Sequence, residues 1–173
     1  MLTGQRVEEI AALHVHQWDA KERIIDWSKT KNGKPHTIPV PPVAAELIAS
    51  IVPNEFGWFF PSAKDPTKPV NAGTLYSFMW RQRDRGIIPV VTNRDLRRTW
   101  KTLAGKAGVP KEIRDRLQNH TLQDVSSKSY DRWNYMPEKR AGMEKWNKFV
   151  TILLTETPSS GSLILPHSAN PTG

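Results

Sequence analysis

The sequence predicts an α+β fold that is mostly α-helical, with a small antiparallel sheet near the N-terminus. Three short segments between residues 14 and 40 alternate polar and apolar side chains, as strands of an antiparallel sheet do. From residue 43 onward, apolar side chains recur at helical spacing in segments separated by Pro, Gly and Asn. The 173 residues contain no internal repeat and are enough for one domain with a hydrophobic core.

The first third of the chain is expected to place the sheet between two helices. Residues 7–13 have apolar side chains at roughly helical spacing. The three expected strands are HVHQWD, RIIDWS and HTIPV, and Asn32-Gly33 between the last two is a strong signal for a hairpin turn. Residues 43–51 form the second expected helix, and the Pro-rich stretch GWFFPSAKDPTKPVN after it is expected to be a loop.

Four more helices are predicted at residues 72–83, about 94–106, 111–117 and 137–148. Asn71 and Asn93 are the expected N-terminal caps of the first two helices, and Pro110 is expected at the first turn of the third. On the first of these helices, Tyr76 and Trp80 are interpreted as core residues. The polar stretch NHTLQDVSSKSYDRW is expected to be a loop followed by a short helix.

The domain prediction divides the chain at about residue 150. Residues 1–150 are expected to form one domain. Residues 151–173 include SSGSLILPHSANPTG, which is rich in Ser, Pro and Gly, and are expected to be a flexible tail or a segment that docks on a partner.

The charge balance favours a polyanionic partner. The net charge is +8 and the isoelectric point is near 9.9, which favours nucleic acid over a membrane surface. The chain has no cysteine, so disulfides, thiolate metal sites and cysteine nucleophiles are excluded. No signal peptide or membrane-spanning run is visible in the sequence, so a cytoplasmic location is expected.

The stretch RDLRRTWKTL carries three arginines within five residues. Leu96 and Trp100 belong to the apolar face of the expected helix, and Arg94, Arg97 and Arg98 surround that face. A solvated helix face normally mixes charges of both signs. A cluster of planar, permanently charged guanidinium groups instead indicates that this helix binds phosphate.

Five separate positions have side chains whose chemistry would fit together, and they are Arg6, Lys31, Arg97, His120 and Tyr130. A tyrosine oxygen can attack a phosphodiester, and arginines can hold its non-bridging oxygens as charge develops. A lysine can protonate the leaving 5′-oxygen, and a histidine can donate a hydrogen bond to the phosphate. Together these residues could cleave a phosphodiester without a metal.

Other chemistries find no support in the sequence. There is no acidic pair at metal-ligand spacing, no Gly-rich phosphate loop and no Gly-x-Ser-x-Gly motif. His14, His16 and His36 are interpreted as surface residues of the strands and not as metal ligands. We therefore expect neither a metal nor a cofactor.

The motifs TGQRVEEI, KTKNGKPHTIPV, RDLRRT, LQNH and SY occur in the order found in the tyrosine recombinases, the phage integrase family. Residues 2–146 resemble the catalytic domain of this family, most closely in integrases of temperate and satellite phages and genomic islands. The resemblance implies a DNA breaking-rejoining catalytic core and site-specific recombination or integration through a 3′-phosphotyrosine. It also implies double-stranded DNA and other recombinase protomers as partners.

The resemblance assigns roles to residues near the N-terminus. Arg6 matches the first catalytic arginine, and Glu9 matches an acidic residue that steadies that region. Lys31 matches the catalytic lysine between the strands, and Lys29 is its rival.

The resemblance also assigns the later motifs, with two departures from the family pattern. Arg97 matches the second arginine of His-x-x-Arg, but the first position is Arg94, which cannot act as a base at neutral pH. His120 matches the family's His/Trp position. Tyr130 matches the nucleophile, although it lies ten residues after His120 where nine are common, so Tyr135 remains a weaker candidate.

Structural interpretations of the same residues remain open. Taken singly, the arginines could form surface ion pairs, His120 could cap a loop and Tyr130 could lie at the edge of the core. Their joint occurrence in family order favours the recombinase interpretation.

The chain begins almost at the first arginine motif, so the resemblance implies a truncated integrase. An alternative is a remnant that binds DNA without cutting it, which exposure of Ile10, Leu13 and Trp18 would favour. Intact packing around Arg6 would favour the enzyme. A basic protein-binding module that does not bind DNA is a third possibility.

Overall fold

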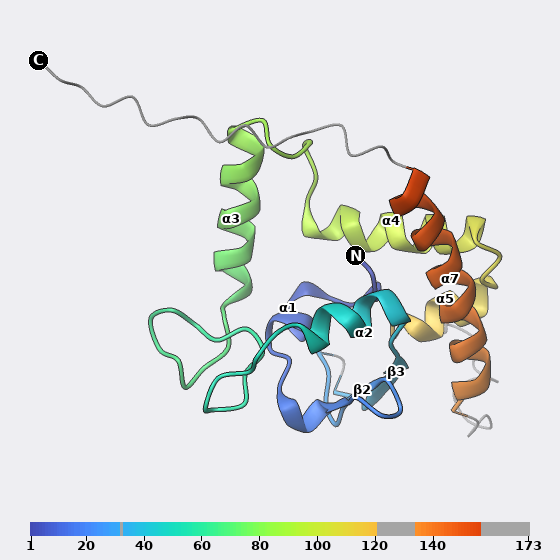
Figure 1. Ribbon diagram of the computed structural model, residues 1–173, viewed down its shortest axis with the longest axis horizontal. Helices are drawn as coiled ribbons and strands as arrows, with labels where there is room; N and C mark the ends of the chain where they lie inside the picture. The colour runs from blue at the N-terminus through green and yellow to red at the C-terminus, as the bar shows by residue number, and fades with distance from the viewer. Residues whose placement is uncertain (32, 121–133, 157–173) are drawn as a thin grey trace, which may run out of the picture.

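The computed structural model describes residues 1–31, 33–120 and 134–156 (Figure 1). The elements are, in chain order, α1 (Val7–Ala11), the 3₁₀ helix η1 (Val15–Gln17), β1 (Trp18–Asp19), β2 (Ile24–Trp27), β3 (His36–Pro39), α2 (Pro42–Ala49), α3 (Ala72–Asp84), α4 (Asn93–Lys106), α5 (Lys111–Leu117) and α7 (Met136–Glu156). The predicted class is confirmed, because the fold is mostly helical with one small antiparallel sheet near the N-terminus. No helix in the described ranges is both long and apolar enough to cross a membrane.

The sheet has three strands in the order β1-β2-β3, and all neighbours are antiparallel. Ile25 of β2 pairs with Ile38 of β3, and both side chains are fully buried. The expected first strand HVHQWD is mostly wrong, because η1 replaces its central residues. The side chain of His14 accepts a hydrogen bond from the His16 amide, and this local contact turns the chain before β1 begins.

The core lies where α4, α5 and α7 meet the sheet. Trp100 of α4 and Trp146 of α7 are completely buried and meet edge to face, with ring centroids 5.9 Å apart. The indole N–H of Trp146 donates to the carbonyl of Leu2 at 2.7 Å, which ties the N-terminal loop to α7. Leu13, at the end of the first helical segment, also belongs to this core.

Two helix ends differ from the sequence predictions. Asn71 caps α3 as predicted, since its side chain accepts a hydrogen bond from Gly73 N. The cap of α4 is Thr92 and not Asn93. Its hydroxyl accepts a hydrogen bond from the amide of Asp95, and the Asp95 carboxylate accepts one from the amide of Thr92. The last helix continues to Glu156, well past the expected end near residue 148.

The helix α3 stands apart from the rest of the fold, on the left of Figure 1. None of its residues is buried, and Tyr76 and Trp80 expose 45% and 54% of their surface. Their interpretation as core residues is therefore wrong. The Tyr76 hydroxyl donates to the carboxylate of Glu8 at 3.0 Å, which links α3 to α1.

Candidate functional site

Arg6 is held at the start of α1 by Glu9. The backbone of Arg6 is extended, and its guanidinium donates to Glu9 Oε1 at 3.0 Å. The other carboxylate oxygen of Glu9 accepts the backbone N–H of Arg6 at 3.3 Å. Because Glu9 is itself buried, this pair fixes the arginine at the helix N-terminus instead of leaving it free in solvent.

Arg97 points inward from α4 and is clamped by backbone carbonyls. One terminal nitrogen donates to the carbonyl of Gly4 at 3.0 Å, and the other donates to the carbonyl of Gln118. The side chain of Gln118 donates in turn to the carbonyl of Arg97 at 3.0 Å. Within the described part of the chain, no carboxylate forms an ion pair with Arg97, so its positive charge remains available to an anion.

The two arginines and His120 share one electrostatic environment. Burial, and next the charge of Arg6, lowers the pKa of Arg97 to about 10, which leaves it cationic at neutral pH. Burial also lowers the pKa of His120, and Arg97 is the next largest cause. A bound phosphate would relieve this repulsion between like charges.

His120 follows α5 and contacts Asp115 and Lys101. Its Nδ1 atom lies 3.2 Å from a carboxylate oxygen of Asp115 and 3.3 Å from the ammonium nitrogen of Lys101. The backbone N–H of His120 donates to the carbonyl of Asp115 at 2.9 Å. The side chain is 40% exposed, so the ring is accessible from solvent.

Both candidate lysines border the same surface hollow as Arg6. This hollow has a volume of about 240 Å³ and lies between α1 and the β2–β3 hairpin. Lys29 and Lys31 are both exposed on its rim. The geometry therefore brings either lysine near Arg6.

The remaining predicted site residues have more varied positions. Arg94 is exposed in the first turn of α4, where its charge reaches Tyr76. Tyr130 lies outside the described residues. Tyr135 immediately precedes α7, and the guanidinium of Arg116 lies over its ring at 3.4 Å.

A buried network, missed in the sequence, links the loop that carries Arg6 to β3 and α5. His36 Nε2 lies 3.1 Å from the side-chain oxygen of Gln5 and 3.1 Å from the carbonyl of Leu117. The amide nitrogen of Gln5 donates to the same carbonyl at 2.8 Å. Since both neighbours of Nε2 are acceptors, this nitrogen carries the proton.

His36 is only 6% exposed, so its interpretation as a surface residue is wrong. Burial, followed by the charge of Lys139, lowers its pKa to about 4. The sequence contains a signal for this position, since His36 lies two residues before Ile38 and therefore on the same, buried face of the strand.

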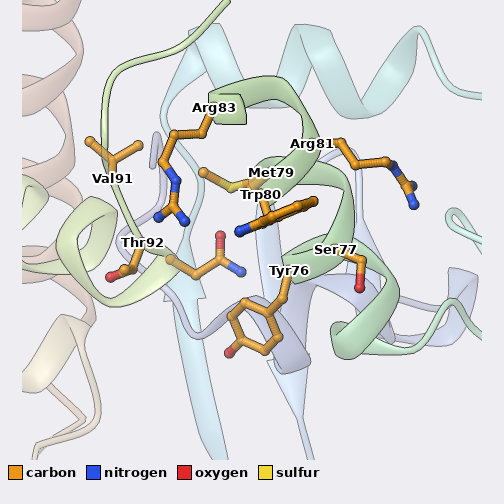
Figure 2. Close-up of a pocket in the computed structure, with 9 residues that line it drawn as sticks. Tyr76, Ser77, Met79, Trp80, Arg81, Arg83, Val91 and Thr92 are labelled. Atoms are coloured by element: carbon orange, nitrogen blue, oxygen red, sulfur yellow. The ribbon is translucent and has the colours of Figure 1, made fainter. Parts of the chain in front are cut away.

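A second hollow, of about 580 Å³, lies beside α3 (Figure 2). Tyr76, Trp80 and Arg83 project from α3 toward the segment that contains Val91 and Thr92. This surface combines exposed aromatic rings with a guanidinium group close to the start of α4.

The comparisons with known proteins agree with this fold. The solved structures that resemble the chain are integrases and recombinases with the tyrosine recombinase catalytic fold. The sequence profile of the phage integrase family matches residues 1–134, so the chain belongs to the phage integrase family. The resemblance found in the sequence motifs is thereby confirmed.

The chain is 26% identical to the prophage integrase IntA of Escherichia coli (strain K12) over 171 residues, which cover 96% of this chain and 40% of that protein. The integrase from mycobacterium phage Brujita has a TM-score of 0.66 and 20% identity, over 84% of this chain and 48% of that chain. XerA recombinase has a TM-score of 0.59 and 16% identity, over 88% and 52%. The Tn1549 transposon integrase in complex with circular intermediate DNA has a TM-score of 0.53 and 17% identity, over 82% and 54%. The chain thus spans about half or less of the length of these relatives.

Proposed function

We propose that the chain is the catalytic domain of a tyrosine-type site-specific recombinase, which breaks and rejoins double-stranded DNA. The observation that supports this most strongly is the joint placement of Arg6 and Arg97. They come from separate elements, each is fixed by hydrogen bonds, and the charge of one lowers the pKa of the other. Such a pre-arranged cationic pair fits the non-bridging oxygens of one phosphodiester.

The two arginines would stabilise the charge that develops on the scissile phosphate. Because their positions are set before the substrate arrives, little reorganisation is needed as the phosphorane forms. His120 would donate a hydrogen bond to the same phosphate, and Arg94 would flank it from the exposed first turn of α4.

Tyr130 would supply the nucleophile. Its phenolic oxygen loses its proton to solvent and attacks phosphorus, the bond from phosphorus to the 5′-oxygen breaks, and a 3′-phosphotyrosine forms. Lys31 donates a proton to the leaving 5′-oxygen, with Lys29 as the alternative donor. The 5′-hydroxyl of a second strand then attacks the phosphotyrosine, which restores the phosphodiester and frees the tyrosine.

Double-stranded DNA would be the substrate and other recombinase protomers would be the partners, acting in the cytoplasm of a bacterial host. The net charge of +8, with Arg81 exposed on α3 and Arg85 exposed at its C-terminal cap, supports a DNA-binding surface. The structurally similar Tn1549 integrase was solved in complex with circular intermediate DNA.

Packing around Arg6 supports the enzyme over a remnant that binds DNA without cutting. Leu13 is buried, and Ile10 and Trp18 are half-buried against the core, whereas the remnant alternative expects all three to be exposed.

Covalent trapping on a nicked suicide duplex, of a sequence that a related integrase cleaves, tests this function. We expect a denaturation-resistant protein–DNA adduct with the wild type and none with Tyr130→Phe. An adduct that survives in Tyr130→Phe and is lost in Tyr135→Phe would transfer the role to Tyr135. Salt-dependent DNA binding without any adduct would contradict the proposed cleavage.

A duplex with a 5′-thiolate leaving group identifies the lysine that donates the proton, because a thiolate can leave without being protonated. We compare Lys31→Ala with Lys29→Ala on this duplex and expect cleavage to be restored only in the variant that lacks the proton donor.

Arg97→Lys tests the clamp on α4. Lysine keeps the charge but cannot hold the carbonyls of Gly4 and Gln118 and the phosphate at once, so we expect the cleavage rate to fall about 100-fold. Arg98→Lys is the matched control, since this neighbouring side chain is exposed, and its cleavage rate should stay within about threefold of the wild type. Equal losses in both variants would contradict the specific role of Arg97.

A further inference from the structure

Asp115 is a buried carboxylate on α5, and the proposed mechanism gives it no role. Its side chain is only 9% exposed, yet three basic side chains surround it. One oxygen, Oδ1, accepts from the ammonium group of Lys101 and lies 3.2 Å from His120 Nδ1. The other, Oδ2, lies 3.4 Å from the ammonium group of the exposed Lys111.

Asp115 holds His120 at two points. Its backbone carbonyl accepts the backbone N–H of His120 at 2.9 Å, which closes the turn after α5. Its carboxylate contacts ring atom Nδ1 of the same residue. The backbone hydrogen bond fixes the position of the His120 main chain, and the ring contact fixes the orientation of its imidazole. Together they determine which edge of the ring points away from the protein.

We propose that Asp115 is a positioning residue that holds Nδ1 of His120, so that Nε2 is the ring atom presented to the scissile phosphate. The inference rests on the proposed function and adds a residue through which His120 acts. Because the carboxylate can only accept, it favours a ring whose Nδ1 carries a proton. A second proton on Nε2 then gives the imidazolium, and this charged ring donates from Nε2 to the phosphate, whose negative charge favours that second proton.

Lys101, on α4, also affects the protonation of the His120 ring. Its ammonium group lies 3.3 Å from His120 Nδ1 and also donates to Asp115 Oδ1. Among the described residues, the charged groups that most influence the His120 pKa are Asp115 on α5 and Lys101 and Arg97 on α4. Asp115 raises the pKa of His120, whereas burial and the two cations lower it. The carboxylate thus offsets part of the repulsion that the two cations exert on a protonated ring.

A titration of the His120 ring by NMR, in the free full chain, tests the contact without any need for activity. We expect Asp115→Asn to lower the pKa of His120 and to shift the proton from Nδ1 toward Nε2. Lys101→Met should raise the pKa of His120, because it removes a cation and leaves the carboxylate. Lys111→Gln is the matched control, since it removes a cation from the far oxygen of the same carboxylate and should leave the ring tautomer unchanged. An unchanged His120 titration in both Asp115→Asn and Lys101→Met would overturn the contact.

The cleavage rate in the trapping experiment then tests the positioning role. We expect Asp115→Asn to slow adduct formation about tenfold when His120 is present. In a His120→Ala background the same substitution should slow it less than about twofold, because the two residues act as one unit. Asp115→Glu should recover part of the rate. Equal losses in both backgrounds would show a purely structural role and overturn the proposal. Absence of an adduct with the wild type would instead contradict the proposed function, and the NMR titration would still decide whether Asp115 holds the ring.

Discussion

At the scale of single residues, Gly4 is a position where the site tolerates little change. Its φ of +68° is in the left-handed region, and a Cβ atom there would lie 2.4 Å from the buried ring of Trp100. Its carbonyl also accepts the hydrogen bond from Arg97. A side chain at this position would therefore push apart the loop that carries Arg6 and the helix that carries Arg97.

Gly4→Ala is expected to destabilise the fold by about 2–4 kcal/mol, from overpacking together with the unfavourable φ. The control is Gly86→Ala, which has a φ of +69° and no atom within 4 Å of the added methyl group, so only the conformational cost of about 1 kcal/mol applies. Urea unfolding of the two variants measures the difference. Equal losses would show that contact with Trp100 is unimportant.

His36 makes stability depend on pH. Its pKa is lowered from 6.5 to about 4, so between these values the unfolded chain binds a proton that the folded chain does not. The contribution is complete above pH 6.5 and is lost as pH falls toward 4. Between pH 7 and pH 4.5, the wild type should lose roughly 2 kcal/mol more unfolding free energy than His36→Gln. Chemical unfolding at the two pH values checks this, and parallel losses in both proteins would contradict it.

The sequence predicted residue types better than residue environments. Motif order identified Arg6 and Arg97 as candidates, because a family retains chemical groups in a fixed sequence order. It did not reveal the network around His36, whose partners Gln5 and Leu117 lie 31 and 81 residues away along the chain. Such long-range hydrogen bonds depend on which surfaces meet after folding, which local pattern does not encode.

At the scale of elements, α4 begins through a reciprocal cap that fixes where its arginines point. Thr92→Ala removes the side-chain bond to the amide of Asp95 and should lower stability by about 1 kcal/mol. Asn93→Ala, at the cap expected from sequence, should cost less than about half of that because Asn93 already lies inside the helix. Thermal unfolding distinguishes the two. A larger loss in Asn93→Ala would restore the sequence-based assignment.

The helix α3 shows what periodicity can and cannot predict. Apolar spacing and the Asn71 cap predicted its start correctly and its end to within one residue. The same spacing suggested that Tyr76 and Trp80 face the core, but both are exposed. Helical spacing identifies an apolar face, whereas the surface that covers it depends on tertiary contacts or on a bound partner.

At the scale of the whole molecule, the candidate site is assembled by contacts between distant parts of the sequence. The loop before α1 supplies Gly4 and Arg6, α4 supplies Arg97, and the turn after α5 supplies Gln118 and His120. Trp100 and Trp146 are completely buried, and they lie against this loop through Gly4 and Leu2 respectively. A change in this packing moves several site residues together, so losses of stability and of cleavage should be correlated for core substitutions.

The distribution of charge over the molecule predicts where the proposed DNA substrate would lie. Each DNA phosphate that a protein cation neutralises releases condensed counterions. The negative slope of log K, the DNA-binding constant, against log salt concentration then becomes steeper by about 0.9. The double variant Arg81→Gln and Arg85→Gln removes two exposed cations from α3 and its C-terminal cap, which stand apart from the core (Figure 1). Anisotropy titrations of a labelled duplex at several salt concentrations should show a slope that is shallower by about 1.8. Lys106→Gln with Lys148→Gln removes the same charge from the last residue of α4 and from the second half of α7, and should change the slope by less than about half as much. Equal changes in the two double variants would mean that net charge alone governs binding, and that α3 does not lie against the DNA.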